Sequence, residues 1–366
     1  MTAAIITIIL MVLFLYVFLK RYPVFGTKPS KQRRLSFQAS AQFSDRRFVN
    51  EIPTVMDTSF TTTLSIAKDF IKGNPNGKPH QQLKTIGFDV KAARGSKDAG
   101  ITWFGHSALM LEMDGKRMLI DPMFGKSPSP FPMFGGKRYS YSKTLPFENS
   151  HLPFIDAIFI SHDHYDHLDF GSIRKLKEKT GRFFVPLGVG GHLERWGVDQ
   201  EKISEHDWWD EVEWEGLDLV CTPAQHFSGR SLTDRNATLW CSWVIGDKQT
   251  KVFFSGDSGY GPHFKTIGER YGPFNAALME CGQYDERWSN IHMMPEETVQ
   301  AFIDVKGGLL IPIHWAAFTL ALHDWNDPIE RVTKEAARKG LPIASPQIGE
   351  TVFIGEDMYP NSVWWK

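Results

Sequence analysis

A cluster of histidines and aspartates follows a short apolar run in the middle of this 366-residue chain. The run at 155–160 leads into Ser-His-Asp-His-Tyr-Asp-His-Leu-Asp, which places His162, His164, Asp166 and His167 within six residues. Imidazole nitrogens and carboxylate oxygens suit zinc and similar divalent ions. A spacing of two puts the first two histidines on one side of an extended segment, whereas Asp166 and His167 follow in a turn and can face a second point. We therefore predict a metal centre, and the spacing allows its ligands to divide between two ions rather than crowd one. The alternative, a solvated polar loop, does not need three histidines from a chain that has 13.

The pattern His-x-His-x-Asp-His after an apolar strand resembles the signature of the metallo-β-lactamase superfamily of hydrolases. That superfamily takes further ligands from later strand ends: a histidine, an aspartate between both metals, and a last histidine. The chain has matching residues in that order, namely His226 in Thr-Pro-Ala-Gln-His-Phe-Ser, Asp257 in Ser-Gly-Asp-Ser-Gly and His314 in Leu-Ile-Pro-Ile-His-Trp. The resemblance implies an α/β fold of the four-layer αβ/βα sandwich type.

The resemblance also implies how the ligands divide between two zinc ions per chain: His162, His164 and His226 on one, Asp166, His167 and His314 on the other, and Asp257 between them. Two divalent ions lower the pKa of a shared water, supply hydroxide as the nucleophile at neutral pH, and stabilise charge on substrate oxygens. Asp166 and Asp257 would thus serve catalysis as well as metal binding. Zinc follows from the ligand types, with iron and manganese as alternatives.

Three further residues are candidates for roles near this centre. Asp121, in Leu-Ile-Asp-Pro, is a candidate acceptor for the N–H of a ligand imidazole, which would fix its tautomer. His106, in Trp-Phe-Gly-His-Ser, follows another early strand. His292 precedes a predicted helix and is a candidate for protonating a leaving group or binding phosphate. The alternatives are turn residues for the first two and a surface histidine for the third.

Strand-like apolar runs alternate with helical segments through the second half of the chain. Asp114 and Gly115, between two such runs, predict a hairpin turn. Helices are predicted at 59–71, 170–179, 191–196, 262–269, 295–304 and 328–338. This alternation predicts an α/β fold whose metal ligands lie on strand-end loops.

The N-terminus predicts a membrane anchor. Residues 1–19 carry no charge and are almost wholly apolar, and as a helix they would be roughly 28 Å long. We predict a single-pass transmembrane helix over 1–21, the alternative being an apolar arm docked on the globular domain. Between residues 20 and 47, eight Lys and Arg stand against one acid, which places the catalytic domain in the cytoplasm under the positive-inside rule. Residues 22–97 are predicted as a basic linker and irregular lead-in, and 98–366 as the hydrolase domain.

Composition sets limits on the class of protein. Apolar residues at 42% and charged residues at 23% are ordinary for a globular chain that buries a full core. A net charge of −1 gives no case for nucleic-acid binding. The three cysteines, without Cys-x-x-Cys spacing, argue against a disulfide framework and favour a reducing compartment.

Longer motifs narrow the superfamily to a branch. They include Ile-Thr-Trp-Phe-Gly-His-Ser-Ala from 101, Leu-Ile-Asp-Pro-Met-Phe from 119, Pro-Ala-Gln-His-Phe-Ser from 223 and Gln-Tyr-Asp-Glu-Arg-Trp from 283. Over about 100–325 they resemble the branch that contains N-acyl-phosphatidylethanolamine-hydrolysing phospholipase D and its bacterial relatives. This resemblance implies cleavage of a phosphodiester bond in a phospholipid, with the substrate lipid and the membrane as partners.

Two other functions stay open at this point. A di-metal hydrolase of a soluble lactone or phosphate ester uses the same ligands, and a non-catalytic, membrane-tethered binding protein would retain only the fold. The Pro-rich apolar run at 127–136 is a candidate lid or membrane-facing lip, with a rigid surface loop as the alternative. Arg287 and the Lys137, Arg138 pair are candidates for contacting a lipid phosphate.

Overall fold

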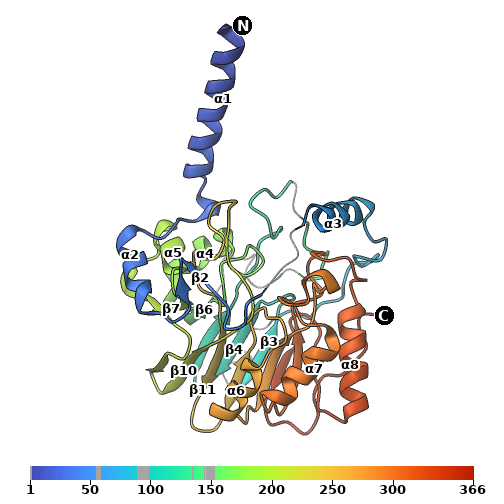
Figure 1. The fold of residues 1–366 in the computed structure, drawn as a ribbon. Coiled ribbons are helices and arrows are strands. Elements are labelled where there is room, and N and C mark those ends of the chain that lie inside the picture. Colours follow the sequence, from blue (N-terminus) through green and yellow to red (C-terminus); the bar gives the residue numbers. More distant parts are fainter. Residues whose placement is uncertain (1, 55–58, 89–98, 134–135, 144, 146–152) are drawn as a thin grey trace.

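The computed structural model describes residues 2–54, 59–88, 99–133, 136–143, 145 and 153–366, and two facing β-sheets form its centre (Figure 1). Within these residues the first sheet has the strand order β15-β3-β4-β5-β6-β7-β8. Its strands are β3 (Gly100–Trp103), β4 (Leu109–Met113), β5 (Lys116–Ile120), β6 (Ile155–Phe159), β7 (Thr180–Pro186), β8 (Ile203–His206) and β15 (Thr351–Phe353). Strands β5 to β8 run parallel, so their carboxyl ends share one edge of the sheet.

The second sheet has the order β14-β13-β12-β11-β10-β9. Its strands are β9 (Glu211–Trp214), β10 (Leu217–Thr222), β11 (Ser242–Gly246), β12 (Lys251–Phe254), β13 (Ala276–Glu280) and β14 (Leu310–Ile313). Strands β12, β13 and β14 are parallel, and β10 has the same direction because both β10 and β12 pair antiparallel to β11. The carboxyl ends of these four strands therefore meet at one edge.

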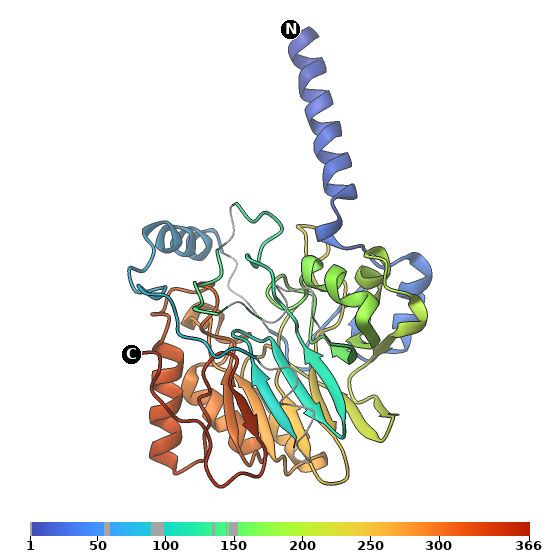
Figure 2. The same cartoon turned by 180° about the vertical axis from the view of Figure 1, so that it is seen from behind.

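Helices lie on the outer face of the second sheet and beside one side of the first (Figures 1 and 2). On the second sheet lie α6 (His263–Arg270), α7 (Pro295–Asp304) and α8 (Asp327–Lys339), and beside β6 to β8 lie α4 (Phe170–Leu176) and α5 (Gly190–Arg195). The lead-in contributes α2 (Lys31–Ser36), the short pair β1 (Phe43–Ser44) and β2 (Arg47–Phe48), and α3 (Phe60–Lys72). The predicted α/β class is confirmed, since both sheets mix parallel and antiparallel strands and are accompanied by helices.

Two local predictions are confirmed. Asp114 and Gly115 join β4 to β5 with φ values of 50° and 69°, the left-handed pair that a type I′ hairpin turn requires. Strand β6 ends one residue before the predicted run does and delivers the histidine motif. Apolar and polar residues do not alternate along β6, because the strand is buried on both of its faces. The boundary predicted at 97 and 98 lies outside the described residues.

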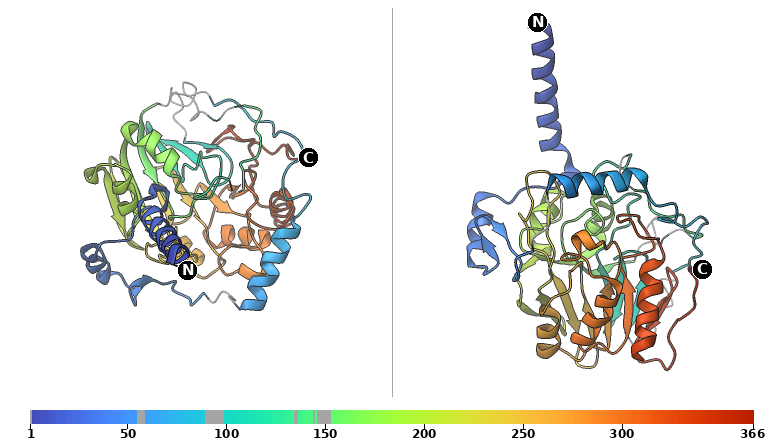
Figure 3. Two further views of the ribbon diagram at one scale, coloured as in Figure 1. Left: turned by 90° about the horizontal axis from the view of Figure 1, so that it is seen from above. Right: turned by 45° about the vertical axis from the view of Figure 1, so that its right-hand side comes forward.

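The N-terminal helix α1 (Thr2–Arg21) projects away from the globular body, as Figures 1 to 3 show. Its apolar side chains from Ile5 to Leu19 are exposed apart from half-buried Phe18, so the alternative of an arm docked on the domain is not what the structure has. Only its base is held, by stacking of Phe18 and Tyr22 on Phe131, with ring centroids 6.3 and 5.9 Å apart.

The structure does not support the predicted transmembrane helix over residues 1–21. Among the residues the structure describes, no helix is both long and apolar enough to cross a membrane.

The contact between Trp243 and Phe159 joins the two sheets. Trp243 of β11 packs edge-on against Phe159 of β6, with 5.4 Å between ring centroids, and its Nε1–H donates to the Ile160 carbonyl at 2.9 Å. Both side chains are buried. The indole therefore crosses the interface immediately before the metal motif begins.

We expect Trp243→Ala to lower the free energy of unfolding by about 3–5 kcal/mol, because it removes a buried aromatic side chain and a hydrogen bond from the sheet interface. Guanidinium denaturation followed by far-UV circular dichroism measures this loss. Met358→Ala is the matched control, since Met358 is 83% exposed and its change should stay within about 0.5 kcal/mol. Equal stability of the two variants would contradict this role for Trp243.

Candidate metal centre

Loops at the carboxyl ends of strands bring all seven predicted ligands together. The motif loop follows β6, and the other three loops follow β10, β12 and β14. These ends meet because the strands share directions within each sheet and the sheets face one another. The side chains are buried, except for partly accessible Asp166 and His164.

The first group, which we call the histidine centre, consists of His162, His164 and His226. His164 Nδ1 lies 2.9 Å from His162 Nε2 and 3.2 Å from His226 Nε2. The Asp257 Oδ2 atom lies 3.8 Å from Nε2 of both His162 and His226. Three imidazoles and a carboxylate oxygen thus converge on one point.

The second group, the aspartate centre, consists of Asp166, His167 and His314, and His106 belongs to the same cluster of possible ligand atoms. The Nε2 atoms of His167 and His314 are 3.3 Å apart, and each lies 3.4–3.5 Å from Asp166 Oδ2. The same Asp257 Oδ2 lies 3.0 Å from His167 Nε2 and 3.1 Å from His314 Nε2. One carboxylate oxygen therefore faces both centres.

These distances fit divalent cations. Ligands at 2.0–2.1 Å from a tetrahedral zinc are separated from one another by roughly 3.3 Å, and most separations within the two centres lie close to that value. In addition, Asp257 Oδ1 is buried and has no hydrogen-bond partner among the described residues. A buried carboxylate oxygen without a donor needs a nearby positive charge.

The electrostatics of the two centres differ. Burial lowers the pKa values of His162 and His226 well below the ordinary value, which keeps these imidazoles neutral, the form that binds metal. Burial also lowers the pKa of His314, but the Asp257 and Asp166 carboxylates reverse this effect and raise it to about 10. The pKa of Asp257, which burial alone would raise, is held well below its usual range by His167 and His314. The aspartate centre therefore attracts positive charge, whether from protons or from a cation.

Each of four ligand imidazoles is fixed through its second nitrogen. The contacts join His162 Nδ1 to Ser161 Oγ (2.9 Å), His167 Nδ1 to Asp121 Oδ2 (2.7 Å), His226 Nδ1 to the Ile291 carbonyl (3.0 Å) and His314 Nδ1 to the Gly282 carbonyl (3.3 Å). Such partners set the ring orientation and the tautomer of a metal ligand.

Asp121 and His106, both predicted to lie near the centre, contact ligands directly. Besides its contact with His167, Asp121 accepts hydrogen bonds from the Ser161 backbone N–H at 2.8 Å and the Ser161 hydroxyl at 2.5 Å. His106 Nε2 lies 2.8 Å from Asp166 Oδ2. Each therefore orients one member of the aspartate centre.

Three site residues have left-handed backbones: His106, Asp121 and His314, at φ values of 53°, 42° and 69°. Such conformations cost about 1–3 kcal/mol each in a residue with a Cβ and are concentrated at functional sites. The His106 N–H donates to the Trp315 carbonyl at 2.8 Å, and the His314 N–H donates to the His106 carbonyl at 2.9 Å. These bonds tie the loops after β3 and β14 together and hold the strain in place.

His292 lies beside the centre, against a buried acid that the sequence analysis did not identify. Its ring stacks on His314, with centroids 5.2 Å apart, and meets His226 edge-on at 5.0 Å. Glu280, the last residue of β13, is fully buried, and its Oε2 lies 3.5 Å from His292 Nδ1. Burial raises the pKa of Glu280, which the charge of His292 opposes. The sequence signal that could have identified Glu280 was its position, an acid at the end of an otherwise apolar run.

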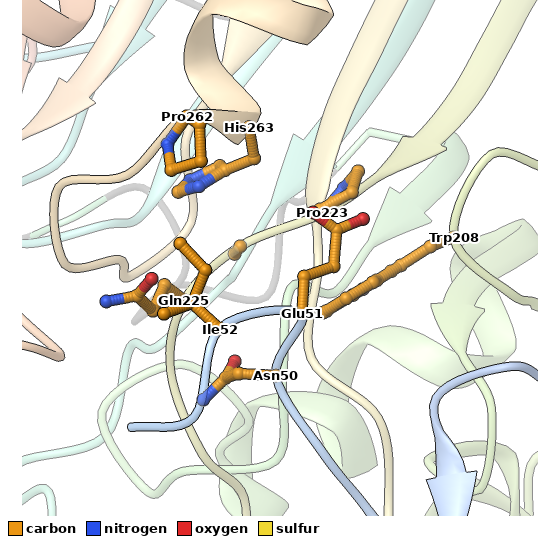
Figure 4. Close-up of a pocket in the computed structure, with 9 residues that line it drawn as sticks. Asn50, Glu51, Ile52, Trp208, Pro223, Gln225, Pro262 and His263 are labelled. Carbon is orange, nitrogen blue, oxygen red and sulfur yellow. The ribbon is translucent and has the colours of Figure 1, made fainter. Parts of the chain in front are cut away.

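A residue of the lead-in also positions a ligand loop. The Asn50 side chain donates to the His226 carbonyl at 2.8 Å and accepts from the His226 N–H at 3.2 Å and from Trp240 Nε1–H at 2.9 Å. Figure 4 shows Asn50 on the wall of a small pocket with Gln225 and Trp208. This pocket contains none of the predicted ligands, and its contacts brace the loop from outside.

Two of the residues predicted to contact a lipid phosphate, Arg287 and Arg138, already have partners within the protein. Arg287 is engaged by Asp285 at 2.7 Å and by Asp69 of α3 at 2.8 Å. The Arg138 guanidinium donates to the Gly125 carbonyl at 3.0 Å, and its Nη1 is buried without a hydrogen-bond partner among the described residues. Within the predicted lip, Phe131 packs on the base of α1, and positions 134 and 135 lie outside the described residues.

Comparison with known proteins gives consistent similarities. The family described as "Beta-lactamase superfamily domain" matches residues 116–315. An uncharacterized protein of Mycobacterium tuberculosis is 38% identical over 93% of this chain and 91% of its own length. The N-acyl-phosphatidylethanolamine-hydrolyzing phospholipase D 1 of Caenorhabditis elegans is 29% identical over 72% of this chain and 74% of its own. A metallo hydrolase structure from the archaeon Ignicoccus hospitalis, 24% identical, superimposes with a TM-score of 0.54 over 69% of this chain and 97% of that one.

We expect Asp121→Asn to weaken metal binding at the aspartate centre about 10–100-fold. The amide would present an N–H group where His167 Nδ1 and the Ser161 hydroxyl need an acceptor. Chelator competition with zinc, followed by elemental analysis, measures the change. Asp114→Asn is the control, since the Asp114 side chain is 54% exposed in the hairpin turn. An Asp121→Asn protein that retains wild-type affinity would contradict the positioning role.

Proposed function

Since the chain belongs to the metallo-β-lactamase superfamily and is a metal-dependent hydrolase, we propose that it cleaves a phosphodiester bond in a phospholipid with two zinc ions. The substrate class is carried by the similarity to the nematode phospholipase D, which extends over most of both chains. The geometry of the ligand cluster supports two ions, and its preponderance of imidazole nitrogens favours zinc.

The histidine centre and the aspartate centre would each hold one zinc, with Asp257 shared between them. Bound zinc ions would supply hydroxide at neutral pH and neutralise charge on the phosphoryl oxygens. The chain's own part is to hold the seven ligands in place. It does so through Asp121, His106 and the carbonyls behind the imidazoles.

His292 is suited to handle the proton of the leaving group. Its side chain is 12% exposed, whereas the ligand His314 on which it stacks is 1% exposed. Glu280 faces Nδ1 of His292, so the ring presents Nε2 as the atom that can give a proton to a departing alkoxide. In the hydrolysis of an N-acylated phosphatidylethanolamine, water oxygen joins phosphorus, the distal P–O bond breaks, and the alcohol leaves with that proton.

We expect the purified zinc-loaded protein to convert N-acyl-phosphatidylethanolamine into phosphatidic acid and a free N-acylethanolamine. Mass spectrometry of the products from mixed phospholipids makes this measurement. Released fatty acid would move the attack to a carboxylic ester. Turnover only of a soluble phosphodiester or a lactone would keep the hydrolase and discard the lipid substrate.

We further expect Asp257→Asn to abolish turnover, because the substitution removes the one carboxylate that faces both centres. Zinc content per chain is measured beside activity. Near-wild-type turnover with two bound zinc ions would contradict the shared role of Asp257. Asp114→Asn again provides the exposed carboxylate control.

A further inference from the structure

Helix α3 turns most of its larger apolar side chains away from the protein, Ile66 excepted. Phe60, Leu64 and Ile71 are 81%, 57% and 88% exposed, and at 100° per residue they form one stripe along the helix. The half-buried positions, Thr62, Ile66 and Asp69, lie on the opposite side. An amphipathic helix of a globular protein normally buries its apolar stripe. Here the stripe faces outward.

The attachment of α3 explains this orientation. Asp69, which lies opposite the stripe, is held at 2.8 Å by Arg287. After the helix, Asn74 donates to the Leu322 carbonyl at 3.0 Å, and the Trp325 N–H donates to the Asn76 carbonyl at 3.0 Å. These partners belong to the loops after β13 and β14. The helix is thus fixed by its polar side at the edge of the sheets that carries the metal ligands.

Other apolar side chains are exposed at the same end of the molecule. Figures 1 and 3 show α3 lying across the end from which α1 projects. The α1 side chains from Ile5 to Val17 are 42–72% exposed, and Met133, which follows the loop at the base of α1, is 88% exposed. Exposed apolar surface gathered at one end marks an interaction site.

Basic side chains accompany the stripe. Lys68 and Lys72 are exposed and border it on one side, four and eight residues after Leu64. Beyond α3, Lys78 and Lys137 line a surface cavity of about 540 Å³, and none of its described lining residues carries a carboxylate. An apolar stripe with lysines on its border is the pattern of a helix that lies in the headgroup region of an anionic membrane.

We propose that α3 is a membrane-docking helix that inserts Phe60, Leu64 and Ile71 into the surface of a bilayer containing anionic phospholipid. A second copy of the chain fits the stripe less well. A helix of 13 residues is about 20 Å long and its stripe about 10 Å wide, or roughly 200 Å², whereas a standard interface buries about 800 Å² per partner. The inference does not depend on the proposed phospholipid hydrolysis.

The first test compares binding of the full-length protein to vesicles. We expect Leu64→Glu with Ile71→Glu to weaken co-sedimentation with phosphatidylcholine–phosphatidylglycerol vesicles about tenfold or more, because two inserted side chains become charged. Met358→Glu is the matched control, an 83% exposed apolar residue outside α1 and α3. Unchanged thermal unfolding and zinc content show that the double variant is folded.

A second measurement separates α3 from α1, which remains intact in these variants. The three native cysteines are buried, so a new surface cysteine is the position an environment-sensitive fluorophore will label. We expect a blue shift with anionic vesicles for a label at Ile71→Cys and a smaller one at Ser65→Cys, which is exposed outside the stripe.

Equal spectra at the two positions, or unchanged vesicle binding by the double glutamate variant, would overturn the proposal. A loss of self-association in that variant, with vesicle binding intact, would instead identify the stripe as a subunit interface. Because these vesicles contain no N-acylated lipid, either failure is distinguishable from failure of the proposed hydrolysis.

Discussion

The site depends on a single buried carboxylate, that of Asp257, which faces imidazole nitrogens of both centres. Removing a carboxylate from water is costly unless positive charge compensates it. The protein meets this cost by directing the ends of β6, β10 and β14 at the end of β12. A proton and a divalent cation bind the same imidazole nitrogens. In either case positive charge lies beside the Asp257 carboxylate and compensates its burial.

Holding these groups in place requires a stiff scaffold. Three residues at the site keep left-handed backbones, and the reciprocal bonds between His106 and the His314 loop fix two of them. Conformations of this kind persist only where surrounding structure over-determines them. Two closely packed sheets, joined by contacts such as that between Trp243 and Phe159, provide that restraint.

The sequence predicted the parts of the site whose signal is local. Three histidines in six residues after an apolar run mark a metal motif without any tertiary information, and the order of His226, Asp257 and His314 was readable through resemblance. Asn50 could not be identified because it acts through contacts that only folding creates, and Glu280 left a single local sign, an acid at the end of an apolar run.

Helices α1 and α3 show a different limit of sequence reasoning. Helix α3 was predicted within one residue at each end, but a periodic pattern gives the width of an apolar stripe and not the direction in which it faces. For α1, uninterrupted hydropathy suggested a span that the described helix does not support. The direction in which a helix face points is a tertiary property, which the sequence of one helix does not contain.

The hold on α3 is weak compared with what its stripe would gain from being covered. The Asp69 carboxylate is 44% exposed, and an ion pair so accessible contributes about 0–1 kcal/mol. Burying a large apolar side chain contributes about 1.5–3 kcal/mol. This ion pair alone therefore contributes less than covering one side chain of the stripe would, and the hydrogen bonds at Asn74 and Asn76 supply the rest of the tether. Arg287 joins Asp69 of α3 to Asp285, which lies between Glu280 and His292 in the chain, so the tether of α3 is anchored in the same segment that leads to His292.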